Sequence, residues 1–193
     1  ALGSGFAEAA KIAFCRDAET FAGYLTRYSA FADDPTALIH HVLSAKKWFI
    51  EVDEHDRLER RLLNFGHTFG HALEAATNHM LPHGLAVAVG VLCACAHPQA
   101  ARTEGTLALT RHCRELIRLA GEEVPVALGG FDHTVFSRAF RSDKKHSAGS
   151  FHLILPFAGG GVAEVRLSSD AAGWASVETA TQHTIEALRR ELP

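Results

Sequence analysis

The chain has 193 residues, of which 19 are basic and 22 acidic, so its formal net charge is −3. Because 47% of the residues are hydrophobic and 21% are charged, the composition is typical of a globular protein and excludes a disordered chain. The mildly acidic balance argues against nucleic acid as a partner, and the longest uncharged apolar run, 84–96, is too short for the roughly 18 residues of a membrane helix. Since no export signal opens the chain, we expect a cytoplasmic protein without a membrane partner.

The N-terminal part of the chain predicts three helices. Apolar residues recur at helical spacing from Phe6 to Leu25, which predicts one helix there. Asp34 followed by Pro35 is typical of a helix start, and the apolar positions continue to Phe49. The stretch 64–78 predicts a third helix, for which Asn64 could be the cap.

The rest of the chain predicts further helices and one β-hairpin. The stretch 84–101 is apolar on all sides, which is typical of a helix buried in a bundle. Thr106 is expected to cap a helix that ends before Gly121. The segments 151–157 and 162–167 flank a glycine-rich turn and predict a hairpin, and a closing helix follows over 177–188. The predicted fold class is therefore mainly α, multi-helical, with one small β-hairpin.

Three of the thirteen histidines form the most informative pattern in the sequence. His67 and His71 stand four residues apart, so on a helix they share one face and can converge on one ligand, while His83 heads the next predicted helix. Spacing alone favours His67 and His71 as a pair of metal ligands. A divalent metal usually also needs a carboxylate, and the spacing does not select one from the acidic residues.

Residues 63–74, Leu-Asn-Phe-Gly-His-Thr-Phe-Gly-His-Ala-Leu-Glu, closely resemble the signature of the 3-dehydroquinate synthase family of sugar-phosphate cyclases. Other motifs of the family occur in the same order along the chain. They are Ala-Glu-x-x-Lys at 7–11, Lys46 and Arg60 before the signature, His-Gly at 83–84, and Asp-Lys-Lys at 143–145 before the predicted strand. The resemblance extends from about residue 4 to residue 167 and implies a dehydroquinate-synthase-like C-terminal domain.

The resemblance implies a set of metal ligands that differs from the one favoured by spacing. A divalent metal, normally zinc with cobalt as a possible substitute, would be bound by Glu8, His67 and His83, and His71 would lie beside the substrate instead. The positions that would line the substrate pocket are Lys11, Lys46, Arg60, Asn64, His71, Lys144 and Lys145. The family substrate, 3-deoxy-arabino-heptulosonate 7-phosphate, carries a carboxylate and a phosphate, which lysine and arginine side chains can neutralise.

The resemblance also implies a reaction and a missing partner. The family converts this substrate to 3-dehydroquinate plus phosphate in the shikimate pathway of aromatic amino-acid biosynthesis, as a phosphate-eliminating lyase that uses and regenerates NAD. Its members are about twice as long and carry an N-terminal NAD-binding domain, whereas this chain shows no glycine-rich turn of the dinucleotide-binding type. Residues 1–193 are therefore expected to be the C-terminal metal- and substrate-binding domain. We expect it to be inactive without the NAD-binding half and to form a homodimer.

Alternative functions stay open at this point. They are another sugar-phosphate cyclase, a relative of metal-dependent alcohol dehydrogenases, and a metal-binding remnant without catalysis. Leu85, Asp56 and the pair Leu58-Glu59 depart from the residues that the family usually has at these positions. Asn64, His71 and the Asp-Lys-Lys run favour the dehydroquinate branch.

Overall fold

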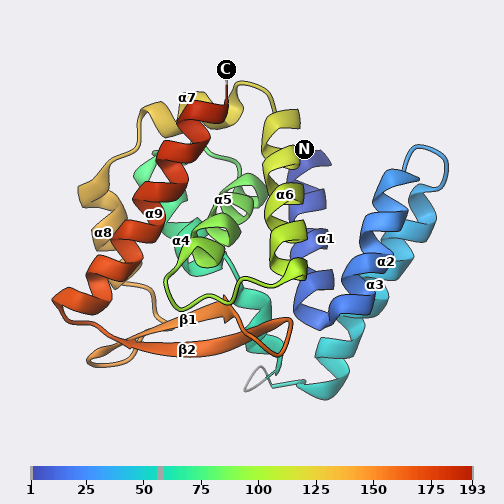
Figure 1. Cartoon of the computed structure of the whole chain (residues 1–193), viewed down its shortest axis with the longest axis horizontal. Helices are drawn as coiled ribbons and strands as arrows, with labels where there is room; N and C mark the ends of the chain where they lie inside the picture. Colours follow the sequence, from blue (N-terminus) through green and yellow to red (C-terminus); the bar gives the residue numbers. More distant parts are fainter. Residues whose placement is uncertain (1, 56–58, 193) are drawn as a thin grey trace.

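Figure 1 shows the computed structural model of the chain, in which residues 2–55 and 59–192 are described. These residues form a bundle of α-helices and one two-stranded antiparallel sheet, so the predicted fold class is confirmed. In chain order the elements are α1 (Leu2–Arg16), α2 (Ala18–Ser29), α3 (Pro35–Val52), the 3₁₀ helix η1 (Glu59–Asn64), α4 (His67–Ala76), α5 (His83–Ala96), α6 (Glu104–Leu119), α7 (Glu123–Gly129), α8 (His133–Arg141), β1 (Ser150–Pro156), β2 (Val162–Ser168) and α9 (Ala171–Glu191).

Helix α5 is the centre of the bundle, as its uniformly apolar sequence predicts. Every residue from Gly84 to Ala94 is buried, and the helix packs against α1, α4, α6, α9 and β1 (Figure 1). It ends at Ala96 rather than at 101, because Pro98 has no N–H and holds the preceding His97 in an extended conformation. In the described part of the chain, no helix has both the length and the hydropathy that a membrane crossing requires.

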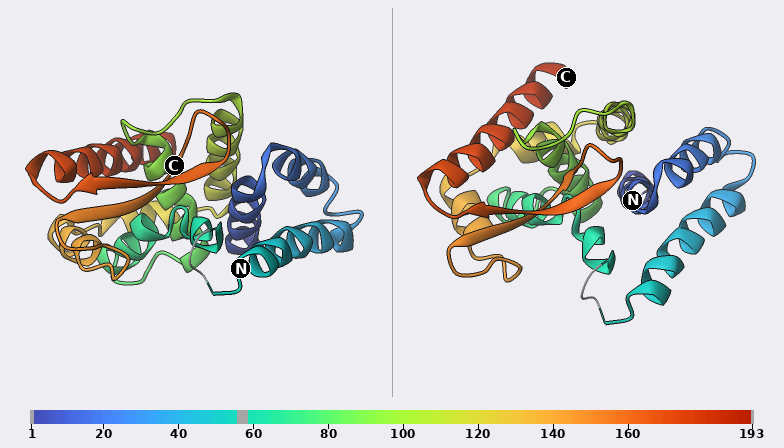
Figure 2. Two further views of the ribbon diagram at one scale, coloured as in Figure 1. Left: turned by 90° about the horizontal axis from the view of Figure 1, so that it is seen from below. Right: turned by 60° about the horizontal axis from the view of Figure 1, so that its bottom comes forward.

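The predicted hairpin is confirmed and closes one side of the bundle. Strands β1 and β2 are antiparallel, with Ser150 opposite Ser168 and Pro156 opposite Val162. Phe151, Leu153 and Leu155 alternate with less buried residues, so one face of the hairpin packs on the helices (Figure 2). At the other edge of the bundle, α2 and α3 pack on each other and on α1 (Figure 2).

The prediction of one helix over Phe6–Leu25 is wrong, because the chain breaks at Asp17 into α1 and α2. Asp17 has an extended backbone, and its side chain accepts a hydrogen bond of 2.7 Å from the Thr20 N–H. An aspartate that caps the following helix competes with continuation of the preceding one. The predicted start of the next helix is confirmed: the Asp34 side chain caps α3, and Pro35 is its first residue.

Two other predicted caps are wrong by a few residues. Helix α6 is capped by Thr103, whose Oγ1 accepts from the N–H of Thr106, so Thr106 lies inside the helix. Asn64 does not cap α4; it ends η1 and donates from Nδ2 to the Arg61 carbonyl at 3.0 Å, while Gly66 stands at the N-cap position of α4. The stretch 64–78 is therefore helical as α4 only over His67–Ala76.

Helices α7 and α8 were not predicted. They are short, and only α8 begins with a clear capping residue, Asp132, whose side chain accepts from the N–H groups of Thr134 and Val135. The predicted closing helix over 177–188 is confirmed within the longer α9.

Helices α4 and α5 approach each other closely because glycines face the contact. A Cβ added to Gly90 would lie 2.1 Å from the Gly66 carbonyl oxygen and 2.8 Å from the Gly70 backbone nitrogen. Both neighbours are backbone atoms, so a side chain at this position forces the helices apart. Since α4 carries His67 and α5 begins with His83, this contact sets the distance between the two imidazoles.

We expect Gly90→Ala to lower the free energy of unfolding by about 3 kcal/mol, the upper end of the range for an overpacked core. The matched control is Gly5→Ala in α1, where an added Cβ meets nothing within 4 Å. There the same change should stabilise the protein by roughly 0.5–1 kcal/mol, because it reduces the entropy of the unfolded chain. Urea unfolding of both variants measures the difference, and equal stabilities would contradict the close approach.

Candidate metal and substrate site

Three helices bring the predicted metal ligands to one point. Glu8 lies in the middle of α1, His67 is the first residue of α4, and His83 is the first residue of α5. Gly66 makes the turn from η1 into α4 with a φ of 76°, and a Cβ there would come within 2.9 Å of the Val87 carbonyl oxygen. Only glycine satisfies both conditions, so this turn places His67 directly beside α5.

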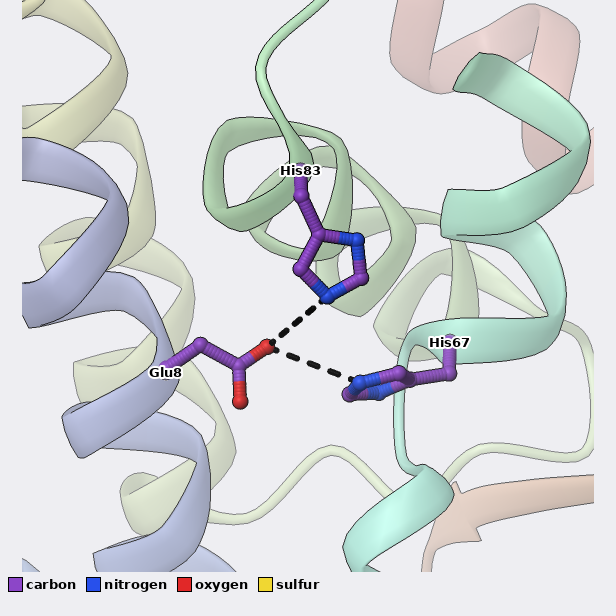
Figure 3. A group of neighbouring side chains, drawn as sticks. All are labelled: Glu8, His67 and His83. Carbon is purple, nitrogen blue, oxygen red and sulfur yellow. Dashed lines mark ion pairs between the residues drawn. The ribbon is translucent and has the colours of Figure 1, made fainter. Parts of the chain in front are cut away.

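The three side chains point at one another (Figure 3). Glu8 Oε1 lies 3.5 Å from His67 Nε2 and 3.8 Å from His83 Nε2. The possible ligand atoms of the three residues all lie within 4.8 Å of one another. Two imidazoles and one carboxylate form a donor set typical of catalytic zinc sites that keep a coordination position open.

The imidazole rings of His67 and His83 form hydrogen bonds through Nδ1, which leaves their Nε2 atoms free to bind a metal. His67 donates from Nδ1 to the Phe65 carbonyl at 3.3 Å, and His83 Nδ1 lies 3.2 Å from both carboxylate oxygens of Glu74. Each Nδ1 therefore carries the proton, and each Nε2 directs its lone pair toward Glu8. Glu8 Oε1 is buried and has no hydrogen-bond partner among the described residues. Electron-pair donors that face one another in this way fit a bound cation.

The protonation states agree with this arrangement. Burial and the positive charge of Lys11 lower the pKa of His67 to about 4, so its ring is neutral at pH 7. Although burial alone would raise the pKa of Glu8, the charge and hydrogen bond of Lys11 hold it below its usual value. A neutral imidazole and an ionised carboxylate are the forms that bind a divalent metal.

Six of the ten predicted site residues line one cleft of about 240 Å³ beside these ligands: Glu8, Lys11, Lys46, Arg60, Asn64 and His67. The Lys11 side chain is only 4% exposed and donates to Glu8 Oε2 at 2.9 Å. Arg60 enters the cleft from η1, which is tied to the end of α3 because the Arg60 N–H donates to Asp53 Oδ2 at 3.1 Å. The cleft thus combines cationic groups with the metal ligands, as the binding of an anionic substrate requires.

His83 is not among the described residues that line this cleft, and the other three predicted residues, His71, Lys144 and Lys145, are in different situations. The His71 ring is 5.5 Å from the His67 ring and 5.9 Å from the His83 ring, and burial with the charge of Lys145 lowers its pKa. Lys145 lines an adjoining shallow recess together with Asn64, and its Nζ forms an ion pair with Asp143 at 2.6 Å. Lys144 is exposed and is not among the described residues that line the cleft or the recess.

Two features of the site were missed by the sequence analysis. Glu74 holds His83, although the sequence shows it only as the last residue of the signature, and its contact crosses from α4 to α5. Glu164 on β2 pairs with Arg61 on η1 at 3.0 Å and with His152 on β1 at 2.9 Å, which joins the hairpin to η1. These contacts join different helices and strands, so the periodicity within one element does not indicate them.

Among the described residues, Leu85 and Glu59 depart from the family pattern, and neither stands at a position proposed as a metal ligand. Leu85 is 2% exposed and belongs to the buried face of α5 beside α1, where an apolar side chain packs well. Glu59 is the first residue of η1. Asp56 and Leu58 lie outside the described residues.

Comparisons with known proteins match most of this chain to one family. Residues 5–146 match the family model described as 3-dehydroquinate synthase C-terminal. A 3-dehydroquinate synthase from Symbiobacterium thermophilum is 35% identical over 198 residues, covering 98% of this chain and 51% of the relative. One from Shewanella halifaxensis is 33% identical over 162 residues, covering 79% of this chain and 44% of the relative. The chain thus spans about half the length of these curated relatives.

A solved structure shares the fold. The 2-epi-5-epi-valiolone synthase from Streptomyces hygroscopicus subsp. jinggangensis, with NAD⁺ and Zn²⁺ bound, superposes with a TM-score of 0.68 at 24% identity. The match covers 96% of this chain and 51% of that protein. At this identity the likeness concerns the fold alone.

Proposed function

The chain belongs to the 3-dehydroquinate synthase family, whose C-terminal domain it matches. On this premise we propose that it is the metal- and substrate-binding half of such an enzyme. The proposed reaction converts 3-deoxy-arabino-heptulosonate 7-phosphate to 3-dehydroquinate plus phosphate. The substrate loses the elements of phosphoric acid, and NAD ends the cycle in its starting state, so atoms and electrons balance. The observation that carries the proposal is that two members of a metal-ligand triad, Glu8 and His67, line one cleft together with several cationic side chains.

The cofactors would be divided between the two halves of the enzyme. Glu8, His67 and His83 would hold the metal, for which we propose zinc, with cobalt as a possible substitute. A bound zinc ion would supply Lewis-acid polarisation of a substrate oxygen. NAD supplies reversible hydride transfer and would be held by the N-terminal half that the longer relatives possess.

The side chains of this half would bind and orient the substrate. Arg60 offers a planar guanidinium that can bind the carboxylate through two hydrogen bonds, and Lys46 offers a point charge to phosphate oxygens. Lys11 and Asn64 line the same cleft and would bind substrate oxygens close to the metal ligands. Lys145 would contribute from the adjoining recess, and Lys144 only if the bound substrate extends beyond it.

His71 is the proposed proton carrier of this half. Its pKa is lowered by burial and by the charge of Lys145, so the ring is neutral at pH 7 and can accept a proton at a ring nitrogen. It neighbours the rings of both histidine ligands without being needed for the Glu8–His67–His83 set. A proton taken up there can be returned to the departing phosphate or to a substrate oxygen.

The test is reconstitution with the N-terminal half of the Symbiobacterium thermophilum relative. We expect phosphate release from 3-deoxy-arabino-heptulosonate 7-phosphate only when both halves, zinc and NAD are present, and none with this chain alone. Sedoheptulose 7-phosphate, which lacks the carboxylate, serves as the control substrate. Turnover of the control substrate instead would favour another sugar-phosphate cyclase. The N-terminal half is first shown to be active with its own C-terminal half. If this chain then binds zinc but gives no turnover with that N-terminal half, a non-catalytic metal-binding domain is favoured.

Two further properties remain predictions. We propose that the complete enzyme is a homodimer and that it acts in the cytoplasm as part of the shikimate pathway. Sedimentation of the reconstituted enzyme measures the first, and fractionation of cells that produce the protein measures the second.

A further inference from the structure

Glu74 is a partly buried carboxylate beside the metal ligands that the proposed mechanism does not use. It lies on α4, one helical turn after His71, and its side chain is 17% exposed. Both of its oxygens lie 3.2 Å from Nδ1 of His83. A side chain at this depth with both oxygens near one ring nitrogen has a defined orientation.

The contact determines the tautomer of His83. A carboxylate only accepts hydrogen bonds, so the ring nitrogen beside it must carry the proton. The proton on Nδ1 leaves the lone pair on Nε2, which is the atom that lies 3.8 Å from Glu8 Oε1. The opposite tautomer would turn an N–H toward the metal position and would exclude a metal ligand.

The two histidine ligands differ in how they are held. His67 is 15% exposed and donates to a backbone carbonyl, that of Phe65, so the fold itself orients its ring. His83 is 50% exposed, and Glu74 provides the hydrogen-bond acceptor for its Nδ1. Of the two histidine ligands, His83 is therefore the more exposed one, and the orientation of its ring depends on the Glu74 side chain.

We propose that Glu74 is a positioning residue of the metal site: it accepts the Nδ1–H of His83, selects the tautomer, and orients Nε2 toward Glu8. This inference rests on the metal site of the proposed function. Acceptors of this kind raise the basicity of a ligand imidazole, and their removal typically weakens metal binding 10–100-fold.

The geometry also offers a competing arrangement, because His71, Glu74 and His83 form a second group whose ligand atoms lie within 4.8 Å of one another. If His83 binds a metal through Nε2, its Nδ1 can bind a second ion only after losing its proton, which gives an imidazolate. A neutral imidazole loses that proton far less readily than it donates it to a neighbouring carboxylate. Glu74 is therefore assigned as a hydrogen-bond acceptor and not as a ligand, and one zinc ion is expected per chain.

Zinc affinity of the purified chain tests the proposal. We expect the zinc Kd, measured by competition with a chromogenic chelator, to rise 10–100-fold in Glu74→Ala and less in Glu74→Gln, whose amide oxygen can still accept the hydrogen bond. Glu186→Ala, which removes an exposed carboxylate from α9, is the matched control and should bind zinc like the original chain. A Kd for Glu74→Ala within threefold of the original overturns the proposal. A stoichiometry of two zinc ions that falls to one in Glu74→Ala also overturns it.

The tautomer of His83 gives a readout without any metal. In the metal-free chain, ¹⁵N shifts of the His83 ring should show a proton on Nδ1, and this preference should persist in Glu74→Gln and be lost in Glu74→Ala. If Glu74→Ala fails to fold, the tautomer of His83 in the original chain still decides, because a proton on Nε2 there overturns the proposal. His83→Ala separates the two levels of inference. Zinc loss in His83→Ala without loss in Glu74→Ala refutes only the role of Glu74, whereas no loss in His83→Ala refutes the metal site itself.

Discussion

Replacing Glu8, His67 or His83 by alanine is expected to remove most of the bound zinc, whereas His71→Ala is expected to retain it. Glu8 Oε1 faces the Nε2 atoms of both ligand histidines at 3.5 and 3.8 Å, so loss of any one group leaves two ligands on the protein. A site with three protein ligands then loses about two orders of magnitude in affinity, or roughly 2.7 kcal/mol. No other single substitution is expected to weaken zinc binding more than these three.

Metal content after dialysis against a fixed free zinc concentration measures this effect in all four variants. His183→Ala, which removes an exposed histidine from α9, controls for adventitious binding by imidazoles. The alternative that spacing alone favours, a His67–His71 pair, makes the opposite prediction for His71 and for His83. Loss of zinc in His71→Ala together with its retention in His83→Ala would refute the ligand set proposed above.

The second large effect is expected from Arg60→Lys in the reconstituted enzyme, where kcat/KM should fall about 10–150-fold. The substitution keeps the positive charge but removes the planar fork that can hold a carboxylate through two hydrogen bonds. Loss of one charge-assisted hydrogen bond costs roughly 1.5–3 kcal/mol, which corresponds to that range. Arg60 lies on η1, and its backbone N–H donates to Asp53, so the chain position itself should not change with the side chain.

Two measurements on the Arg60→Lys variant separate charge from geometry. Inorganic phosphate should bind to the zinc-loaded chain with nearly unchanged affinity, because a point charge remains in the cleft. The carboxylate-bearing sugar phosphate should bind more weakly. Arg118→Lys, an exposed position in the last turn of α6, is the matched control and should change neither affinity. Unchanged substrate binding and turnover in Arg60→Lys would remove the support for a carboxylate subsite at this position.

Much of the architecture is predictable because it depends on local patterns. The start of α3 follows from the Asp34-Pro35 pair, the burial of α5 from its uniformly apolar residues, and the hairpin from two apolar segments around a glycine-rich turn. Local patterns also explain the errors. Helical periodicity continues across Asp17, where one capping side chain ends the helix, and the short helices α7 and α8 contain too few turns to show a clear period.

By itself, the sequence determined the fold class and, through its ordered motifs, the family, and it drew attention to His67, His71 and His83. Spacing alone favoured His67 and His71 as the ligand pair, because it relates only residues on one helix. Tertiary structure decided the rest. It brings Glu8 from α1 to His67 and His83, places Glu74 behind His83, and puts Lys145 rather than Lys144 at the recess beside the cleft. The physical reason is that the site lies where α1, α4 and α5 meet, and the separation of α4 and α5 is set by backbone contact at Gly66 and Gly90, which no periodicity within either helix records.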